Sequence, residues 1–195
     1  MQSLRASYLL PLLGFSALSM TACGGDDPVS VSAPIGINLK AEEGDVKDNN
    51  VINVEKGIST ESGNPWGAFM KDIDDQLGGP AGDIALEKVE LSMAASSVGV
   101  TSLSQVFDGL IEIQFEMSDS GNFFTVASAT VDADTTGRTI ALDSSFDYRD
   151  YQAVDLDKLD SGSFKVVLGA PAEAGFKDLK AKAELQITFS FAAYE

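Results

Sequence analysis

The sequence predicts a mainly β protein, an antiparallel β-sandwich of jelly-roll or Greek-key type with about eight strands and one inserted helix near residues 65–77. Three observations lead to this prediction. Apolar and polar residues alternate over many short segments, turn-forming residues separate these segments, and apolar residues at helical spacing occupy one further segment. A sheet that is apolar on one face has to cover that face, and a second sheet is the simplest cover.

The first expected strand covers residues 29–39, in which every second residue is apolar. Pro34 and Gly36 occupy positions between these apolar residues. Because proline cannot donate a hydrogen bond to a neighbouring strand, the pair favours an edge position or a bulge. A weaker alternation over residues 50–58 predicts the next strand.

The expected helix has clear start and stop signals. Asn64 suits the N-cap and Pro65 suits the first helical position, while Gly78 and the glycine and proline after it end the helix. The apolar residues between these signals fall on one helical face, which is more often a core face than a platform for a ligand. These residues are Trp66, Phe69, Met70, Ile73 and Leu77.

Several strands are expected in the second half of the chain. Between Leu86 and Val89 the apolar phase slips by one residue, which predicts a bulge. A short helical turn is expected at residues 102–107. The strands expected in this part of the chain cover residues 84–93, 111–117, 123–131, 140–146 and 164–170.

The last expected strand has the longest alternation, with apolar residues at every second position from 179 to 193. A straight strand of this length would reach about 50 Å, because each residue adds about 3.3 Å. We therefore expect this strand to bend or to switch between the two sheets.

The N-terminal segment predicts export from the cytoplasm. Arg5 precedes an apolar stretch over residues 6–20, which is shorter than the roughly 20 residues that a membrane-spanning helix needs. The residues Met-Thr-Ala at 20–22 then precede Cys23, the only cysteine of the chain. This segment, residues 1–23, resembles the signal and lipobox of bacterial lipoproteins.

The resemblance implies that residues 1–22 are removed, that Cys23 carries a diacylglyceryl group, and that its amino group is acylated. Two or more acyl chains hold a protein stably on a membrane. Residues 23–28 would then form a tether and residues 29–195 a single domain. Gly24 stands where aspartate commonly signals retention at the inner membrane, so the resemblance favours the outer membrane. The alternative is a soluble secreted or periplasmic protein in which Cys23 is incidental.

The composition excludes several kinds of chemistry. With 30 acidic against 13 basic residues the formal charge is −17, which disfavours binding to nucleic acid. The chain has no histidine and one cysteine, so His-dependent triads, Cys-His pairs and the usual zinc, copper and haem ligand sets are missing. No glycine-rich nucleotide-binding motif is present.

These exclusions favour a non-catalytic domain that binds or scaffolds a protein or glycan partner in the cell envelope. The alternative is a carboxylate-based hydrolase of the glycosidase kind, which needs two suitably spaced carboxylates. No spacing in the sequence selects such a pair.

The acidic segment 147–162 is the most suggestive candidate site. Asp155, Asp157 and Asp160 lie close together before a strand, and calcium prefers oxygen ligands from acidic loops. Their spacing is not that of an EF-hand, and solvated aspartates are common in turns. Calcium is therefore the one cofactor that the sequence suggests.

Two tyrosines of the same segment, Tyr148 and Tyr151, could stack on a sugar ring. The other interpretation, which we favour, is that they pack over the end of the sandwich as lids. Phe123 and Phe124 are expected on opposite faces of one strand, one in the core and the other covered by the helix.

Overall fold

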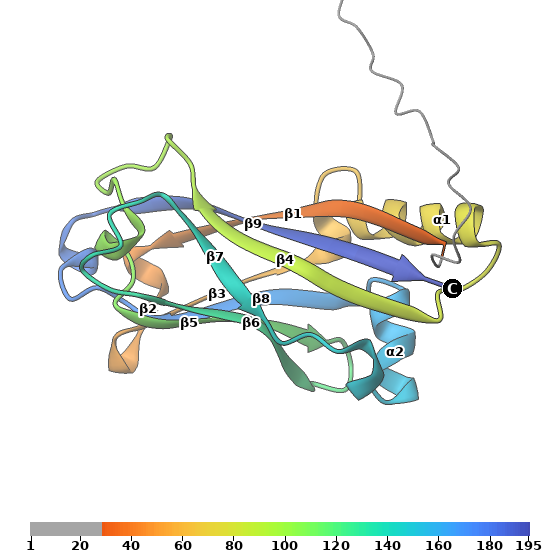
Figure 1. Ribbon diagram of the computed structural model, residues 1–195. Coiled ribbons are helices and arrows are strands. Elements are labelled where there is room, and N and C mark those ends of the chain that lie inside the picture. Colours follow the sequence, from red (N-terminus) through yellow and green to blue (C-terminus); the bar gives the residue numbers. More distant parts are fainter. Residues whose placement is uncertain (1–28) are drawn as a thin grey trace, which may run out of the picture.

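The computed structural model describes residues 29–195; Cys23 and the segment that predicts export lie outside this range. Within it the chain is mainly β, as predicted, and every pair of neighbouring strands is antiparallel. The strands form one curled sheet whose two halves face each other (Figure 1). The described range contains nine strands: β1 (Ser30–Glu42), β2 (Val46–Lys47), β3 (Val51–Gly57), β4 (Asp83–Met93), β5 (Gly109–Met117), β6 (Phe123–Val131), β7 (Thr139–Ser144), β8 (Phe164–Pro171) and β9 (Lys182–Tyr194).

The sheet has the strand order β1-β9-β4-β7-β6-β5-β8-β3-β2, and it changes layer at β7. Residues 139–142 of β7 pair with β4 in one layer, whereas residues 143–144 pair with β6 in the other. The switch between layers, one of the two outcomes predicted for the C-terminal strand, is made by β7. Since β9 pairs with β1 along one edge and with β4 along the other, its backbone is held within one layer.

Most elements lie where the sequence places them. β1 is the edge strand that Pro34 predicts, and the register of β4 against β9 shifts between Leu86 and Lys88, where the bulge is expected. Helix α1 (Pro65–Leu77) begins with the Asn64 side chain accepting a hydrogen bond from the Gly67 amide at 3.1 Å. It ends at Gly78, whose φ of 76° favours glycine.

Two segments differ from the expected structure. Residues 147–162 are not a loop, because they contain the short 3₁₀ helix η5 (Tyr148–Asp150) and the helix α2 (Ala153–Asp160). The apolar residues of α2 form no complete helical stripe, so tertiary contacts rather than periodicity define it. Leu179 precedes β9 and is exposed, because the chain turns at Lys180, which has a φ of 47°.

One core lies between the two layers, and α1 packs against strands of both layers. The Trp66 ring contacts Phe191 of β9 edge-on, with the ring centroids 5.2 Å apart, and Phe164 of β8 at 5.3 Å. Phe69 and Ile73 of α1 are also buried in this core, as the helical stripe predicts. Neither helix of residues 29–195 is long and apolar enough to cross a membrane.

Candidate functional site

Two adjacent hollows lie at the end of the sandwich next to α2, and we call them together the aromatic hollow. Their volumes are about 240 and about 260 Å³, and they share Phe123, Phe124 and Asp150. Rings and carboxylates from β6, from the segment after β7 and from α2 line them. The aromatic members are Phe123, Phe124, Phe146 and Tyr151, and the acidic members are Asp147, Asp150 and Asp155.

The aromatic wall is built on Tyr151. Its ring lies 4.3 Å from the ring of Phe124 and 5.6 Å from that of Phe146, measured between centroids. Only 6% of Tyr151 is exposed, and burial raises the pKa of its hydroxyl above the ordinary value. Tyr151 is therefore a packed side chain that supports the wall.

Phe123 is the exposed ring of the hollow. It begins β6, and alternation along the strand points it away from the face that Phe124 occupies. Phe124 is partly buried, but Phe123 is 55% exposed, so the helix expected to cover it does not do so. The Phe123 ring is therefore accessible to a ligand.

Asp155 holds the back of the hollow in place. Its carboxylate is 1% exposed and accepts hydrogen bonds from the Ser120 hydroxyl at 3.1 Å and from the Asn122 amide group at 3.1 and 3.2 Å. Because Ser120 and Asn122 lie in the turn between β5 and β6, these bonds join that turn to α2. The position of Phe123, the next residue after Asn122, depends on this connection.

The carboxylates of the hollow have no basic partner. Within residues 29–195, neither Asp147 nor Asp150 nor Asp155 makes an ion pair, and the Asp147 side chain accepts only from the Arg149 amide, at 2.9 Å. The nearby cations are engaged elsewhere. The Arg149 guanidinium bonds Asp83 at 2.7 Å, and Lys158 of α2 bonds Asp119 at 2.8 Å.

The other predicted site residues lie apart from the hollow. The Tyr148 hydroxyl donates to Asp160 at 3.1 Å, and burial raises the pKa of Tyr148 to about 12. Asp157 is exposed on α2. No group of three or more acidic, histidine or cysteine side chains in the described range is placed to hold a metal ion. Calcium binding stays a prediction from the sequence.

Phe146 and Asp150 of the hollow were missed as site residues. A signal is present, because Phe146 and Asp150 belong to the run Phe-Asp-Tyr-Arg-Asp-Tyr, which contains three rings and three charged residues. The run alone does not show which side chains share a surface, since η5 turns them in different directions.

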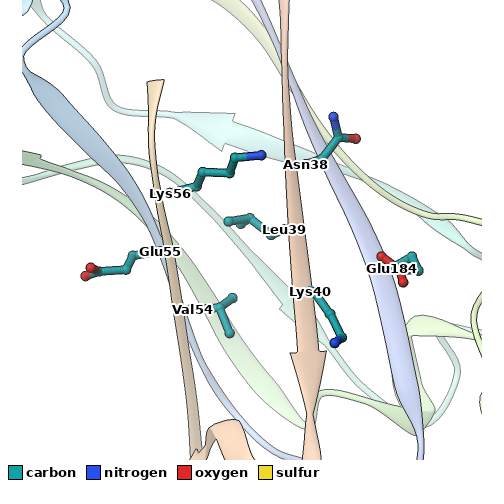
Figure 2. A pocket seen from close by; sticks show the side chains of 7 residues that line it. All are labelled: Asn38, Leu39, Lys40, Val54, Glu55, Lys56 and Glu184. Atoms are coloured by element: carbon teal, nitrogen blue, oxygen red, sulfur yellow. The ribbon is translucent and has the colours of Figure 1, made fainter. Parts of the chain in front are cut away.

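A larger hollow, of about 400 Å³, lies at the seam where β1 and β3 run side by side without hydrogen-bonded pairing (Figure 2). Leu39 of β1 and Val54 of β3 face each other across the seam, and both are buried. The charged side chains around this hollow are paired within the protein. The pairs are Lys40 with Glu42, Lys56 with Glu61, Lys165 with Glu55, and Lys182 with Glu184.

Glu61 closes one end of this seam. Its carboxylate is 7% exposed and bonds the Asn38 amide at 3.3 Å, the Asn38 side chain at 3.1 Å and the Lys56 ammonium. Burial would raise the pKa of Glu61, but the hydrogen bonds from Lys56 and Asn38 outweigh burial and hold this pKa below its ordinary value. The seam is therefore closed by contacts that the chain makes with itself.

Comparisons with known proteins give no family. No protein-family model matches the sequence, and no curated protein matches it. Two solved structures of turnip yellow mosaic virus, one of them its empty head, align with the whole chain and with 90% of their own chains at 11% identity. Their TM-scores are 0.29 and 0.28, which are too low to support an inference about fold or function.

Proposed function

We propose that this chain is a lipid-anchored protein of the bacterial cell envelope whose β-sandwich binds a partner molecule, without catalysis, at the aromatic hollow. The observation that carries the binding site is Phe123, a half-exposed ring beside carboxylates that have no basic partner. The anchor rests on Cys23 and the segment before it. The outer membrane is the proposed location, because Gly24 follows the cysteine.

An anchor at Cys23 would keep the hollow near the membrane. The chain from Cys23 to Ser30 spans at most about 25 Å. Ser30 pairs with Tyr194, Tyr194 pairs with Asp83, and Asp83 bonds Arg149 in the segment that lines the hollow. The start of β1 and the hollow therefore lie at the same end of the sandwich (Figure 1). This arrangement suits a partner that is itself at the membrane surface.

The hydrolase alternative gains no support from the geometry. Such an enzyme needs two carboxylates in one pocket, one of which has a raised pKa. Burial raises the pKa of Asp160, but Asp160 lines neither part of the aromatic hollow. We therefore propose binding alone.

The anchor is tested by replacing Cys23 with serine in the full-length chain, expressed in a Gram-negative host that is fed a labelled fatty acid. The wild-type chain should sediment with membranes and have the mass of residues 23–195 plus three acyl chains. Cys23→Ser should carry no label and keep residues 1–22. Ser19→Ala, a change inside the export segment, is the matched control and should be processed like the wild type. A Cys23→Ser chain with unchanged label and mass would refute the anchor.

A further inference from the structure

We infer that the aromatic hollow accepts a cationic side chain, a lysine ammonium or an arginine guanidinium, presented by a basic segment of a partner protein. This inference rests on the proposed function and names the chemistry that the hollow recognises. Three properties of the hollow support it, namely its charge, its supply of hydrogen-bond acceptors and its size.

The charge of the hollow lacks a complement within the protein. Asp147 and Asp150 line the same hollow as four rings, and the two nearest basic residues in sequence, Arg149 and Lys158, already pair with Asp83 and Asp119. The chain as a whole has a formal charge of −17. Such a field speeds the approach of a cationic partner and disfavours an anionic one.

Asp147 and Asp150 of the hollow can only accept hydrogen bonds. Two donors of the lining are already used, because Asn122 donates to Asp155 and the Ser145 hydroxyl donates to the Thr125 carbonyl at 2.9 Å. Ammonium and guanidinium groups donate only, so they match this set. Charge is what distinguishes such a cation from a sugar hydroxyl, which both donates and accepts.

The aromatic rings of the hollow can also bind a cation. A cation within about 6 Å of an aromatic face is attracted to the ring, and a guanidinium also stacks on it. Phe123 offers an exposed face, whereas Phe124, on the other face of β6, packs against Tyr151. Carboxylates beside aromatic faces therefore suit an organic cation better than a metal ion, which would use the oxygens alone.

The volume fits one side chain. Pockets for drug-sized ligands have volumes of about 300–1,000 Å³. The two parts of the hollow have volumes of about 240 and about 260 Å³. A single long side chain enters a space of this size while the rest of the partner stays outside.

The test is an amide-shift NMR titration of the mature acylated protein in neutral detergent micelles. The probes are N-acetyl-arginine amide and N-acetyl-citrulline amide, which have similar shapes but differ in charge, with glucose as a neutral sugar. The arginine probe should shift the amides of Phe123, Asp147 and Asp150, and the citrulline probe should not. A peptide with three arginines should bind at least tenfold more tightly than the single amide, and binding should weaken with salt.

Matched variants locate the effect. Asp147→Asn combined with Asp150→Asn should weaken binding of the arginine peptide at least tenfold, and Phe123→Ala at least threefold. Asp132→Asn combined with Asp134→Asn removes the same charge from a distant acidic turn and should change binding less than twofold. In these variants the folded state is checked by the unperturbed amides of β9.

The outcomes separate this inference from the proposed function. Equal shifts with arginine and citrulline, or shifts at these residues with glucose, would overturn the cation assignment and leave the hollow as a binding site. Tighter binding of tetramethylammonium than of the arginine peptide would replace the side chain by a small quaternary ammonium ligand and also overturn it. No shift at the hollow with any probe would overturn both.

Discussion

The seam between β1 and β3 and the aromatic hollow are both places where the hydrogen-bonded ladder of the sheet is interrupted, yet they differ in how their charges are satisfied. At the seam Lys40, Lys56 and Glu184 each have an ion-pair partner within the protein. At the hollow Asp147 and Asp150 have none in the described part of the chain. The volume at the seam, about 400 Å³, is larger than that of either part of the hollow, but the charged groups of the seam already have partners.

The seam needs this closure because an open strand edge can pair with another chain. The Asn38 amide bonds Glu61 and therefore points away from β9. Alternate residues of an antiparallel strand point toward the same edge, so Pro34, four residues earlier, also faces the seam. Proline has no amide to offer there, and Glu61 occupies the amide of Asn38. Volume alone is thus a poor guide to a binding site, and unsatisfied polar groups are a better one.

The largest effect on stability is expected from Glu61→Ala. The change removes the buried carboxylate that accepts from the Asn38 amide and pairs with the half-buried Lys56 ammonium, which should reduce the free energy of unfolding by about 2–3 kcal/mol. Glu55→Ala removes a half-exposed glutamate that pairs with Lys165 on the outer face, and it should cost less than about 0.5 kcal/mol. Urea unfolding measures both. Equal costs for the two variants would show that the seam is not held by Glu61.

The same contact makes stability depend on pH. Because the folded pKa of Glu61 lies below the unfolded value, the ionised carboxylate stabilises the protein above the ordinary glutamate pKa of 4.5, and this stabilisation disappears as the pH falls through the folded pKa. Glu61→Gln should flatten the acid side of the stability curve, measured as thermal midpoint between pH 3 and 7. An unchanged slope in Glu61→Gln would contradict this assignment.

A smaller effect is expected at the back of the hollow, from Asp155→Ala. The Ser120 hydroxyl and the Asn122 amide lose the buried carboxylate that joins them to α2, which should cost about 2 kcal/mol. Asp157→Ala, an exposed aspartate on the same helix, should change stability by less than about 0.5 kcal/mol. Chemical denaturation compares the pair. A neutral Asp155→Ala would mean that α2 is not joined to the β5–β6 turn through this carboxylate.

Sequence periodicity predicts the elements whose two faces differ in burial. β5 and α1 have this property, because each turns one face to the core and the other to solvent. The periodicity does not predict α2, because polarity and burial are inverted there: Asp155 is buried and Val154 is exposed. Tertiary hydrogen bonds rather than an apolar stripe define that helix, and no local pattern reports them.

The candidate site is only partly readable from the sequence for the same reason. Tyr151 could be selected as an aromatic beside carboxylates, but its neighbour Phe124 comes from β6, which is distant in sequence. Glu61 could not be selected at all, since its contact with Asn38 forms only when β1 and the end of β3 come together in the folded chain. Long-range pairings of this kind follow from the whole topology.

A still smaller effect on stability is expected from Tyr148→Phe beside the hollow. Burial raises the pKa of Asp160, and the hydrogen bond from Tyr148 partly opposes this shift, so loss of the hydroxyl should raise the pKa of Asp160 further. A raised carboxyl pKa means that the folded protein binds more protons, so stability falls as the pH rises through this region, more steeply in the variant. Carbon-detected titration of Asp160 measures the pKa. A downward shift would contradict this account.

The smallest change in stability is expected from Phe123→Ser, which is the sharpest test of the contrast between the two regions. A ring that is 55% exposed at the start of β6 buries little area, so the free energy of unfolding should change by less than about 0.5 kcal/mol. Leu39→Ser at the seam is the matched change, because Leu39 is 6% exposed and contributes to the core, and it should cost at least about 2 kcal/mol. If Phe123→Ser were as costly as Leu39→Ser, Phe123 would be a packing residue and the hollow would be as self-contained as the seam. If Phe123→Ser leaves the free energy of unfolding unchanged but weakens binding of the arginine peptide, then the Phe123 ring contributes to binding and not to stability.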